Sequence, residues 1–349
     1  MQLVAYGAQD VYLTGDPQIT FWKGVYRRHT HFAIESIENT FSGSVSAGAS
    51  TSCTISRNAD LLSAIHLEVV VTAANAASDV GYGVVSSAEV QIGGQTIDKQ
   101  YGNWMQVWDD LTLPEEKVTG YNKMIGASLT ADSHTLYIPL KFWFCRHPGS
   151  AIPLVALQFH EVRVKVTFGN PMDDNGTPAA VTIDSAKLYA DYVYLDEEER
   201  QRFSQSAQEY LIEQVQHKSV TLADGTENIS IPFNHPVKEL IWNTPGEVDS
   251  SKITFNGQDR AASRAGLYYS HVQPYQHHTR IPAVADRVYC YSFGLRPEEH
   301  QPSGTVNFSR IDNASMTIVG GGTGTANIYA VNYNVLRVQS GLGGLAYSN

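Results

Sequence analysis

The sequence predicts an all-β protein built from two tandem β-sandwiches. Short runs of alternating apolar and polar residues recur along most of the chain, with Gly, Pro and Asn between them. The second half repeats the style of the first, and helical spacing is confined to a few places. At 349 residues the chain is longer than one typical core supports, which also favours two domains.

Strand patterns in the first half are clearest at residues 162–168. Alternate positions there are apolar, so Val, Val, Val and Phe fall on one face. Residues 65–71, 88–92 and 188–195 also favour strands, and Gly93-Gly94 is a hairpin signal. In the second half, strands are predicted at 228–231, 239–242, 287–293, 315–319 and 328–335.

An internal repeat supports two related sandwiches. Residues 157–162 resemble 306–311, and each segment precedes a strand. Residues 188–195 resemble 328–335, and each closes its half of the chain. The common order of these pairs is typical of a duplicated unit.

Two segments favour helices. Residues 101–111 carry apolar side chains at a spacing of three to four, and the polar stretch 196–212 starts with acidic residues that suit a helix N-terminus. The domain junction is placed in the second of these segments. The predicted organisation is an N-terminal segment over 1–30, a first sandwich over 31–200, a linker helix over 201–214 and a second sandwich over 215–349.

Composition limits the function. The net charge is −11 and only 17% of residues are charged, so the chain lacks the clustered Lys and Arg that direct nucleic-acid binding needs. Cys53, Cys145 and Cys290 are far apart and odd in number, which indicates reduced thiols and no zinc site. Neither a signal peptide nor an uninterrupted apolar run of about 20 residues is evident, so we expect a soluble protein until it assembles.

No residue constellation predicts catalysis, a cofactor or a metal. The glycine-rich segment 319–325 lacks the ending of a phosphate-binding loop and favours a flexible hairpin. His277 and His278, with His271 nearby, favour an aromatic surface loop over a metal site, which would need further ligands. We therefore expect no catalytic, cofactor-binding or metal-binding residues, and no cofactor.

Three long motifs resemble one protein family. They cover residues 6–32, 302–314 and 329–349, in the same order as in the family and over almost the whole chain. The sequence resembles the major capsid proteins of large eukaryotic DNA viruses. That resemblance implies two tandem eight-stranded jelly rolls, a double jelly roll with few short helices.

The resemblance also implies a function and partners. The chain would form homotrimers that present six similar wedges and tile an icosahedral capsid as pseudo-hexagonal capsomers. Its partners would be further copies, neighbouring capsomers, minor capsid and penton proteins, and an internal membrane. The location would be the virion capsid, assembled in the host cytoplasm.

The sequence differs from the family in one respect, and two alternative functions stay open. Relatives are commonly longer, with elaborate outward loops, whereas the loops here look short; a smaller virus or a minor capsid paralogue would fit this feature. The main alternative is a virus-encoded carbohydrate-binding jelly roll displayed as a spike or fibre. An enzyme is a weaker alternative, because no motif supports it.

The N-terminal segment contains the candidate assembly contacts. Its Gly-Asp-Pro sequence favours a turn, and the flanking aromatic residues are too apolar for a solvated tail. The paired arginines suit either a salt-bridged pair at the edge of the first sandwich or contact with an acidic protein surface or lipid headgroups. The hypothesis is that residues 1–30 lie on the inner face of the shell. The candidate residues are Asp16, Pro17, Phe21, Trp22, Arg27 and Arg28.

Overall fold

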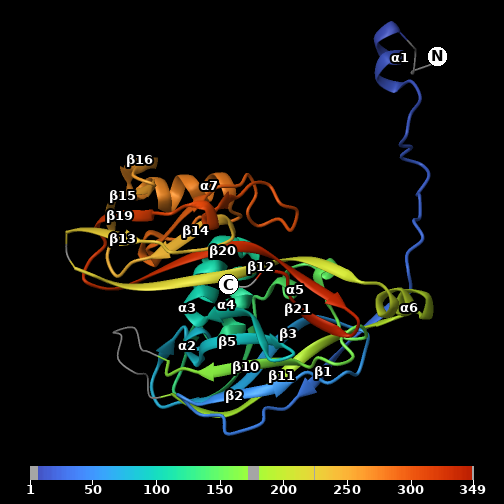
Figure 1. Cartoon of the computed structure of the whole chain (residues 1–349), viewed down its shortest axis with the longest axis horizontal. Helices are drawn as coiled ribbons and strands as arrows, with labels where there is room; N and C mark the ends of the chain where they lie inside the picture. The colour runs from blue at the N-terminus through green and yellow to red at the C-terminus, as the bar shows by residue number, and fades with distance from the viewer. Residues whose placement is uncertain (1–6, 172–180, 224, 348–349) are drawn as a thin grey trace. The chain divides into compact units, whose positions relative to one another are not determined.

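The computed structural model describes residues 7–171, 181–223 and 225–347 (Figure 1). It divides the chain into two compact units, Met1–His31 and Phe32–Asn349. Residues 1–6 of the N-terminal segment and residues 348–349 of the last motif lie outside the described ranges.

The N-terminal unit contains one short helix, α1 (Ala8–Thr14). The backbone N–H of Gly7 donates to Oδ2 of Asp10 over 2.8 Å, which satisfies one of the free amides at the helix start. After the helix, Asp16 adopts a positive φ of 47°, a conformation that Asp tolerates better than most residues. The side chains of residues 7–31 are exposed.

The second unit starts with a sandwich of two antiparallel sheets that have four main strands each, which we call the first sandwich; the short strand β9 (Ile152–Pro153) also pairs with β3. Its strand orders are β1-β11-β3-β8 and β2-β10-β5-β6, which is the order of a jelly roll. The strands are β1 (Phe32–Asn39), β2 (Ser50–Thr54), β3 (Leu61–Ala73), β5 (Val85–Ile92), β6 (Gln95–Tyr101), β8 (Ser133–Pro139), β10 (Val162–Phe168) and β11 (Val181–Leu195).

The second sandwich repeats this arrangement strand for strand. Its sheets have the orders β12-β20-β14-β17 and β13-β19-β15-β16. The predicted fold, two tandem eight-stranded jelly rolls, is therefore confirmed. The strands are β12 (Gln208–Leu222), β13 (Thr226–Ser230), β14 (Pro236–Asn243), β15 (Val248–Phe255), β16 (Gln258–Ala265), β17 (Val288–Ser292), β19 (Ala314–Gly320) and β20 (Gly324–Gln339).

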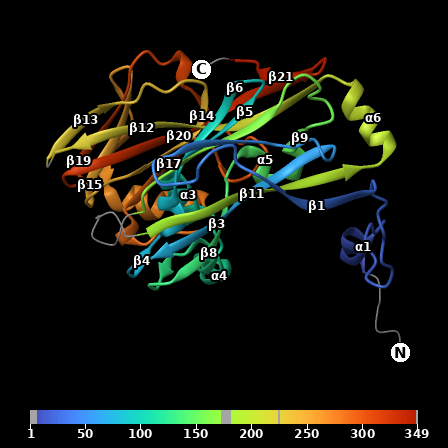
Figure 2. The same cartoon turned by 90° about the horizontal axis from the view of Figure 1, so that it is seen from below.

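Shorter elements occupy the connections between these strands. In each sandwich, the connection after the fifth main strand is helical: α3 and α4 follow β6 (Figure 2), and η2 and α7 follow β16. These elements and the remaining ones are α2 (Val80–Val84), α3 (Gly102–Thr112), α4 (Glu115–Ile125), α5 (Trp143–Arg146), α6 (Glu197–Gln205), α7 (Gln273–His277), η1 (Pro148–Ser150), the π-helix η2 (Tyr268–Val272), η3 (Val284–Asp286), η4 (Phe308–Arg310), β4 (Ala77–Ser78), β7 (Ser128–Leu129), β9 (Ile152–Pro153), β18 (Val306–Asn307) and β21 (Leu342–Leu345).

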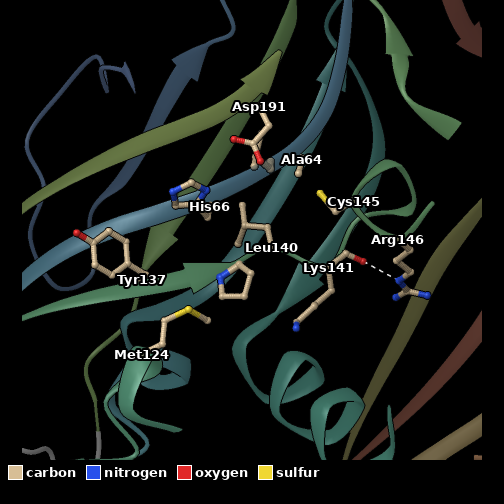
Figure 3. A pocket seen from close by; sticks show the side chains of 11 residues that line it. Ala64, His66, Met124, Tyr137, Leu140, Lys141, Cys145, Arg146 and Asp191 are labelled. Carbon is tan, nitrogen blue, oxygen red and sulfur yellow. Dashed lines mark hydrogen bonds between the residues drawn. The ribbon is translucent and has the colours of Figure 1, made fainter. Parts of the chain in front are cut away.

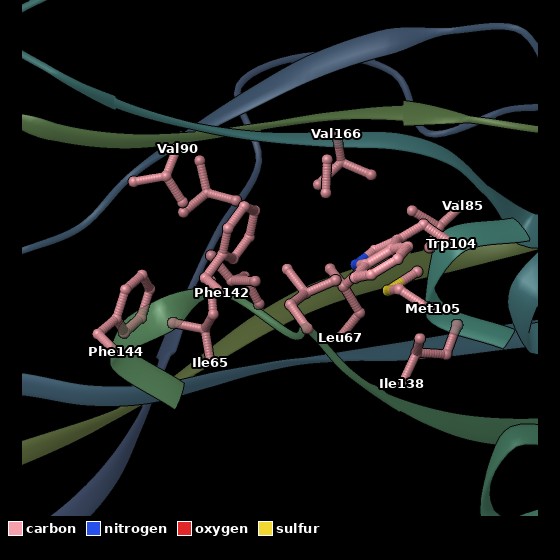
Figure 4. Close-up of a cluster of buried hydrophobic side chains, with 14 of the residues drawn as sticks. Ile65, Leu67, Val85, Val90, Trp104, Met105, Ile138, Phe142, Phe144 and Val166 are labelled. Atoms are coloured by element: carbon pink, nitrogen blue, oxygen red, sulfur yellow. The ribbon is translucent and has the colours of Figure 1, made fainter. Parts of the chain in front are cut away.

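Side chains from both sheets of the first sandwich fill one core (Figure 4). Strand β10 shows the predicted alternation, because Val162, Val164, Val166 and Phe168 are all buried. Trp104 of α3 is also fully buried. The predicted helix at 101–111 is therefore confirmed, and its apolar side faces the protein interior. No helix among the described residues is long and apolar enough to cross a membrane.

The predicted linker helix over 201–214 is wrong in its extent. Helix α6 ends at Gln205, and β12 starts at Gln208 and pairs with β20 along its whole length. Residues 208–214 therefore belong to the second sandwich. The physical reason is tertiary: Ile212 is fully buried in the sheet, and local polarity does not reveal that pairing.

The prediction that the glycine-rich segment 319–325 forms a hairpin is wrong, because β19 and β20 belong to different sheets. It carries the chain from one sheet of the second sandwich to the other. The predicted use of glycine is confirmed, since Gly320, Gly321 and Gly322 all have positive φ values, of 80°, 86° and 72°.

Candidate assembly surfaces

The two sandwiches lie side by side and bury one large face against each other. The outer face of the β12-β20-β14-β17 sheet supplies one half of this contact. Along β20, Ile328 and Ala330 pack into the core of the second sandwich, whereas Tyr329 and Val331 pack with the apolar cluster of the first. This strand is therefore buried on both sides, although its sheet is antiparallel.

Helix α3 supplies the other half of the contact. The ring of Trp104 lies 5.1 Å from that of Tyr329, and Tyr329 Oη donates to Oδ1 of Asn103 over 2.8 Å. His217 of β12 also stacks on Tyr329, with a ring distance of 4.8 Å. These contacts fix how the sandwiches sit together, because aromatic rings pack in specific geometries.

A buried ion-pair network lies beside the aromatic contact. Glu213 accepts from Lys238 Nζ and from Arg146 Nη1, both at 2.8 Å. The guanidinium of Arg146 also lies 4.2 Å from the ring of Trp108. Burial raises the pKa of Glu213, but Lys238 and Arg146 outweigh burial and hold this pKa below its usual value.

The predicted surface loop at His277 and His278 is wrong for His278. Its side chain is fully buried, with Nε2 3.1 Å from Oε2 of Glu239 and Nδ1 3.0 Å from Oε1 of Glu298. His277 is half-buried and its Nδ1 lies 3.0 Å from the backbone oxygen of Leu295. The prediction failed because nothing local in the sequence shows that β14 passes beneath α7.

These histidines do not gather into a metal site. In the described part of the chain, no group of three or more His, Cys, Asp or Glu side chains is arranged to hold a metal ion. His271 contacts a different group, since its Nδ1 lies 2.8 Å from Ser270 Oγ. Burial lowers the pKa of His278, but Glu239, Cys290 and Glu298 together raise this pKa well above 6.5.

The outer face of the β1-β11-β3-β8 sheet contains a hollow of about 430 Å³ (Figure 3). His66 of β3, Tyr137 of β8 and Met124 of α4 lie on one side of it, and Lys141 and Cys145 lie on the other. Burial raises the pKa of Cys145 to about 12, so its thiol is a poor nucleophile at neutral pH. The hollow thus offers a surface to which another protein segment can bind, and its cysteine is not activated as a nucleophile.

The N-terminal unit places the six candidate residues along one exposed segment. The rings of Phe21 and Trp22 meet edge to face at 6.1 Å, and both side chains are about nine-tenths exposed. Within described residues 7–31, neither Arg27 nor Arg28 forms an ion pair, and Asp16 and Pro17 follow α1.

Family models match nearly the whole chain. A model described as the N-terminus of the major capsid protein matches residues 20–196. A second, described as the major capsid protein of large eukaryotic DNA viruses, matches residues 199–247 and 244–344. The chain belongs to this family of viral capsid proteins. It is a structural subunit of the capsid of a large DNA virus.

Individual capsid proteins show the same relationship. The chain is 48% identical to the major capsid protein of Pyramimonas orientalis virus and 40% identical to that of Paramecium bursaria Chlorella virus 1, over all of this chain and 99% of each relative. A quasi-atomic model of the PBCV-1 virus capsid matches with a TM-score of 0.87 and 37% identity, over 95% of this chain and 100% of that one. The alignments extend over 394 and 433 positions against 349 residues here, so these relatives carry insertions.

Proposed function

We propose that three copies of this chain form a homotrimeric, pseudo-hexagonal capsomer that tiles an icosahedral shell. The observation that carries the proposal is the repeated strand order of the two sandwiches, which lie side by side in one unit. Three such chains around a threefold axis present six similar wedges. A contact between unlike surfaces of successive copies closes such a ring.

The N-terminal segment is proposed to contact other shell components. Its exposed Phe21 and Trp22 offer apolar area, and Arg27 and Arg28 offer guanidinium groups that suit carboxylates or phosphates. Neighbouring capsomers, minor capsid and penton proteins, and an internal membrane are the partners that this chemistry fits. We place these contacts on the inner face of the shell, after assembly in the host cytoplasm.

We propose a purely structural role, without catalysis and without direct binding of nucleic acid. The net charge of −11 disfavours contact with phosphate backbones. The free thiols also lack activation, because burial raises the pKa values of Cys53, Cys145 and Cys290. The short connections between strands suggest a low-profile capsomer.

Light scattering and negative-stain electron microscopy of the purified protein test the trimer. We expect a mass near three times 38.3 kDa and hexagonal tiles with threefold symmetry. A stable monomer at micromolar concentration would contradict the proposal. Single lobes or elongated fibres in the images would favour a spike or fibre protein instead.

A further inference from the structure

An exposed apolar patch surrounds the helical connection of the second sandwich. We define the α7 patch as Leu267, Val272, Tyr275 and Leu295. Leu267, Tyr275 and Leu295 are 63%, 77% and 73% exposed, and His277 joins α7 to the backbone oxygen of Leu295. A cluster of large apolar side chains at such exposure is typical of a binding surface.

The first sandwich shows what the equivalent connection does when it has a partner. Both α3 and the η2–α7 segment follow the fifth main strand of their sandwich, β6 and β16. Helix α3 packs on the outer face of the sheet β12-β20-β14-β17, where Tyr329 is only 1% exposed. Within one chain, therefore, the connection of one sandwich covers the sheet of the next.

The equivalent sheet of the first sandwich, β1-β11-β3-β8, has no such cover within the described part of Phe32–Asn349. Its Tyr137 is 40% exposed, and His66 stacks on Tyr189 at a ring distance of 5.4 Å along an open face. The hollow seen in Figure 3 opens on this face. Among the described residues, the η2–α7 connection and the β1-β11-β3-β8 sheet thus each lack the kind of partner that α3 and the β12-β20-β14-β17 sheet find in each other.

We infer that the α7 patch of one copy docks into the hollow on the β3–β8 face of a second copy, with Tyr275 entering beside His66 and Tyr137. This inference rests on the proposed trimer and names its contact. Because the two surfaces differ and both occur on every chain, the contact is heterologous and closes a ring of three. Alternating contacts within and between chains then produce the pseudo-sixfold arrangement.

The chemistry of the hollow favours an aromatic side chain over a small anion. Lys141 already pairs with Asp109 at 2.7 Å, and Arg146 already pairs with Glu213. Both the lysine and the arginine of the lining are therefore already paired with carboxylates. A tyrosine matches a site that combines aromatic and aliphatic walls with polar groups at its edge.

A site-specific cross-link tests the contact without destabilising the fold. We would replace Tyr275 with the photoreactive residue p-benzoyl-phenylalanine in the full chain and irradiate the assembled protein. We expect a product of two chains on a denaturing gel, with the cross-linked peptide within residues 61–73 or 133–146. The same replacement at Phe159, which is 73% exposed on another loop, is the control and should not label these peptides.

Two charge substitutions provide an independent readout. We expect Tyr275→Asp to raise the concentration at which the trimer dissociates at least tenfold, whereas Phe159→Asp leaves it unchanged. The contact is refuted if the protein is trimeric but cross-links elsewhere, or if Tyr275→Asp does not change the concentration at which the trimer dissociates. Either result would still be consistent with the proposed trimer. A wild-type protein that stays monomeric overturns both.

Discussion

Nε2 of His278 lies 3.1 Å from Oε2 of Glu239, and neither side chain is accessible to solvent. Their contact joins the end of α7 to the centre of β14. In the described structure the carboxylate of Glu239 has no hydrogen-bond partner, so the charge of His278 is its main compensation. This pair therefore holds the helical connection of the second sandwich against its sheet.

Replacing His278 with Gln should destabilise the protein in a pH-dependent way. The folded-state pKa of His278 is raised, so its stabilising charge is fully present below the unfolded value near 6.5 and is lost as the pH rises through the folded value. We expect a loss of about 3 kcal/mol in the free energy of unfolding at about pH 6. Denaturant unfolding from about pH 5 to 9 measures the decline of this difference.

The matched control is His277→Gln, one residue earlier. His277 is half-buried and its ring contacts a backbone oxygen, not a carboxylate. Its replacement should therefore lower the free energy of unfolding by less, and this loss should vary less with pH. A difference for His278→Gln that grew with rising pH would show that the buried imidazole is neutral in the folded protein.

Tyr329→Phe should weaken the contact between the two sandwiches while preserving its shape. The substitution removes the 2.8 Å hydrogen bond to Asn103 and leaves the aromatic stack intact. We expect a loss of about 1 kcal/mol in unfolding free energy. Tyr347→Phe, at an exposed tyrosine, is the control, and an equal effect of both variants would argue against a special role for this bond.

Lys238→Met should destabilise the protein most at neutral pH and less in acid. Lys238 is 1% exposed and pairs with Glu213, whose pKa is held below its usual value. A depressed carboxyl pKa stabilises the fold above the unfolded value near 4.5, and this contribution is lost as the pH falls through the folded value. The variant should lose about 3 kcal/mol at neutral pH and lose less at low pH, as measured by urea unfolding.

An exposed ion pair provides the comparison for Lys238→Met. Lys252 pairs with Asp259 at 3.3 Å on the surface, where water and salt screen the interaction. Lys252→Met should therefore leave both the stability and its pH profile almost unchanged. Equal losses of unfolding free energy in the two lysine variants would show that burial does not strengthen the Lys238–Glu213 ion pair.

Deleting residues 1–25 should separate folding from shell assembly. The N-terminal unit is distinct from Phe32–Asn349, which contains both sandwiches, so the truncated protein should stay β-rich and trimeric. It should fail to build closed shells, as judged by circular dichroism, light scattering and electron microscopy. Normal particles from the truncated protein would contradict the proposed role, and a failure to fold would identify the segment as part of a core.

A milder variant isolates the aromatic contribution of this segment. Phe21→Ser combined with Trp22→Ser removes the exposed ring pair and keeps the chain length. We expect the same loss of closed shells with unchanged trimers. Thr20→Ser at the preceding position is the control and should assemble normally.

The sequence by itself determined the fold class and nine of the sixteen main strands of the two sandwiches. Val162–Phe168 alternates with a period of two and lies in the sheet with its apolar face inward, because a strand exposes alternate side chains to opposite faces. Residues 101–111 likewise carry the helical stripe of α3. These patterns are local, because each depends only on the spacing of neighbouring side chains. The repeated order of motifs also predicted two related sandwiches.

Only the tertiary structure decided how the connections pack. Nothing around His278 in the sequence identifies Glu239, some forty positions earlier, as its buried partner. The end of α6 depends on the pairing of β12 with β20, and the glycines after β19 lead into another sheet. Contacts between distant segments depend on how complete sheets stack, and a local pattern of polarity cannot encode that stacking.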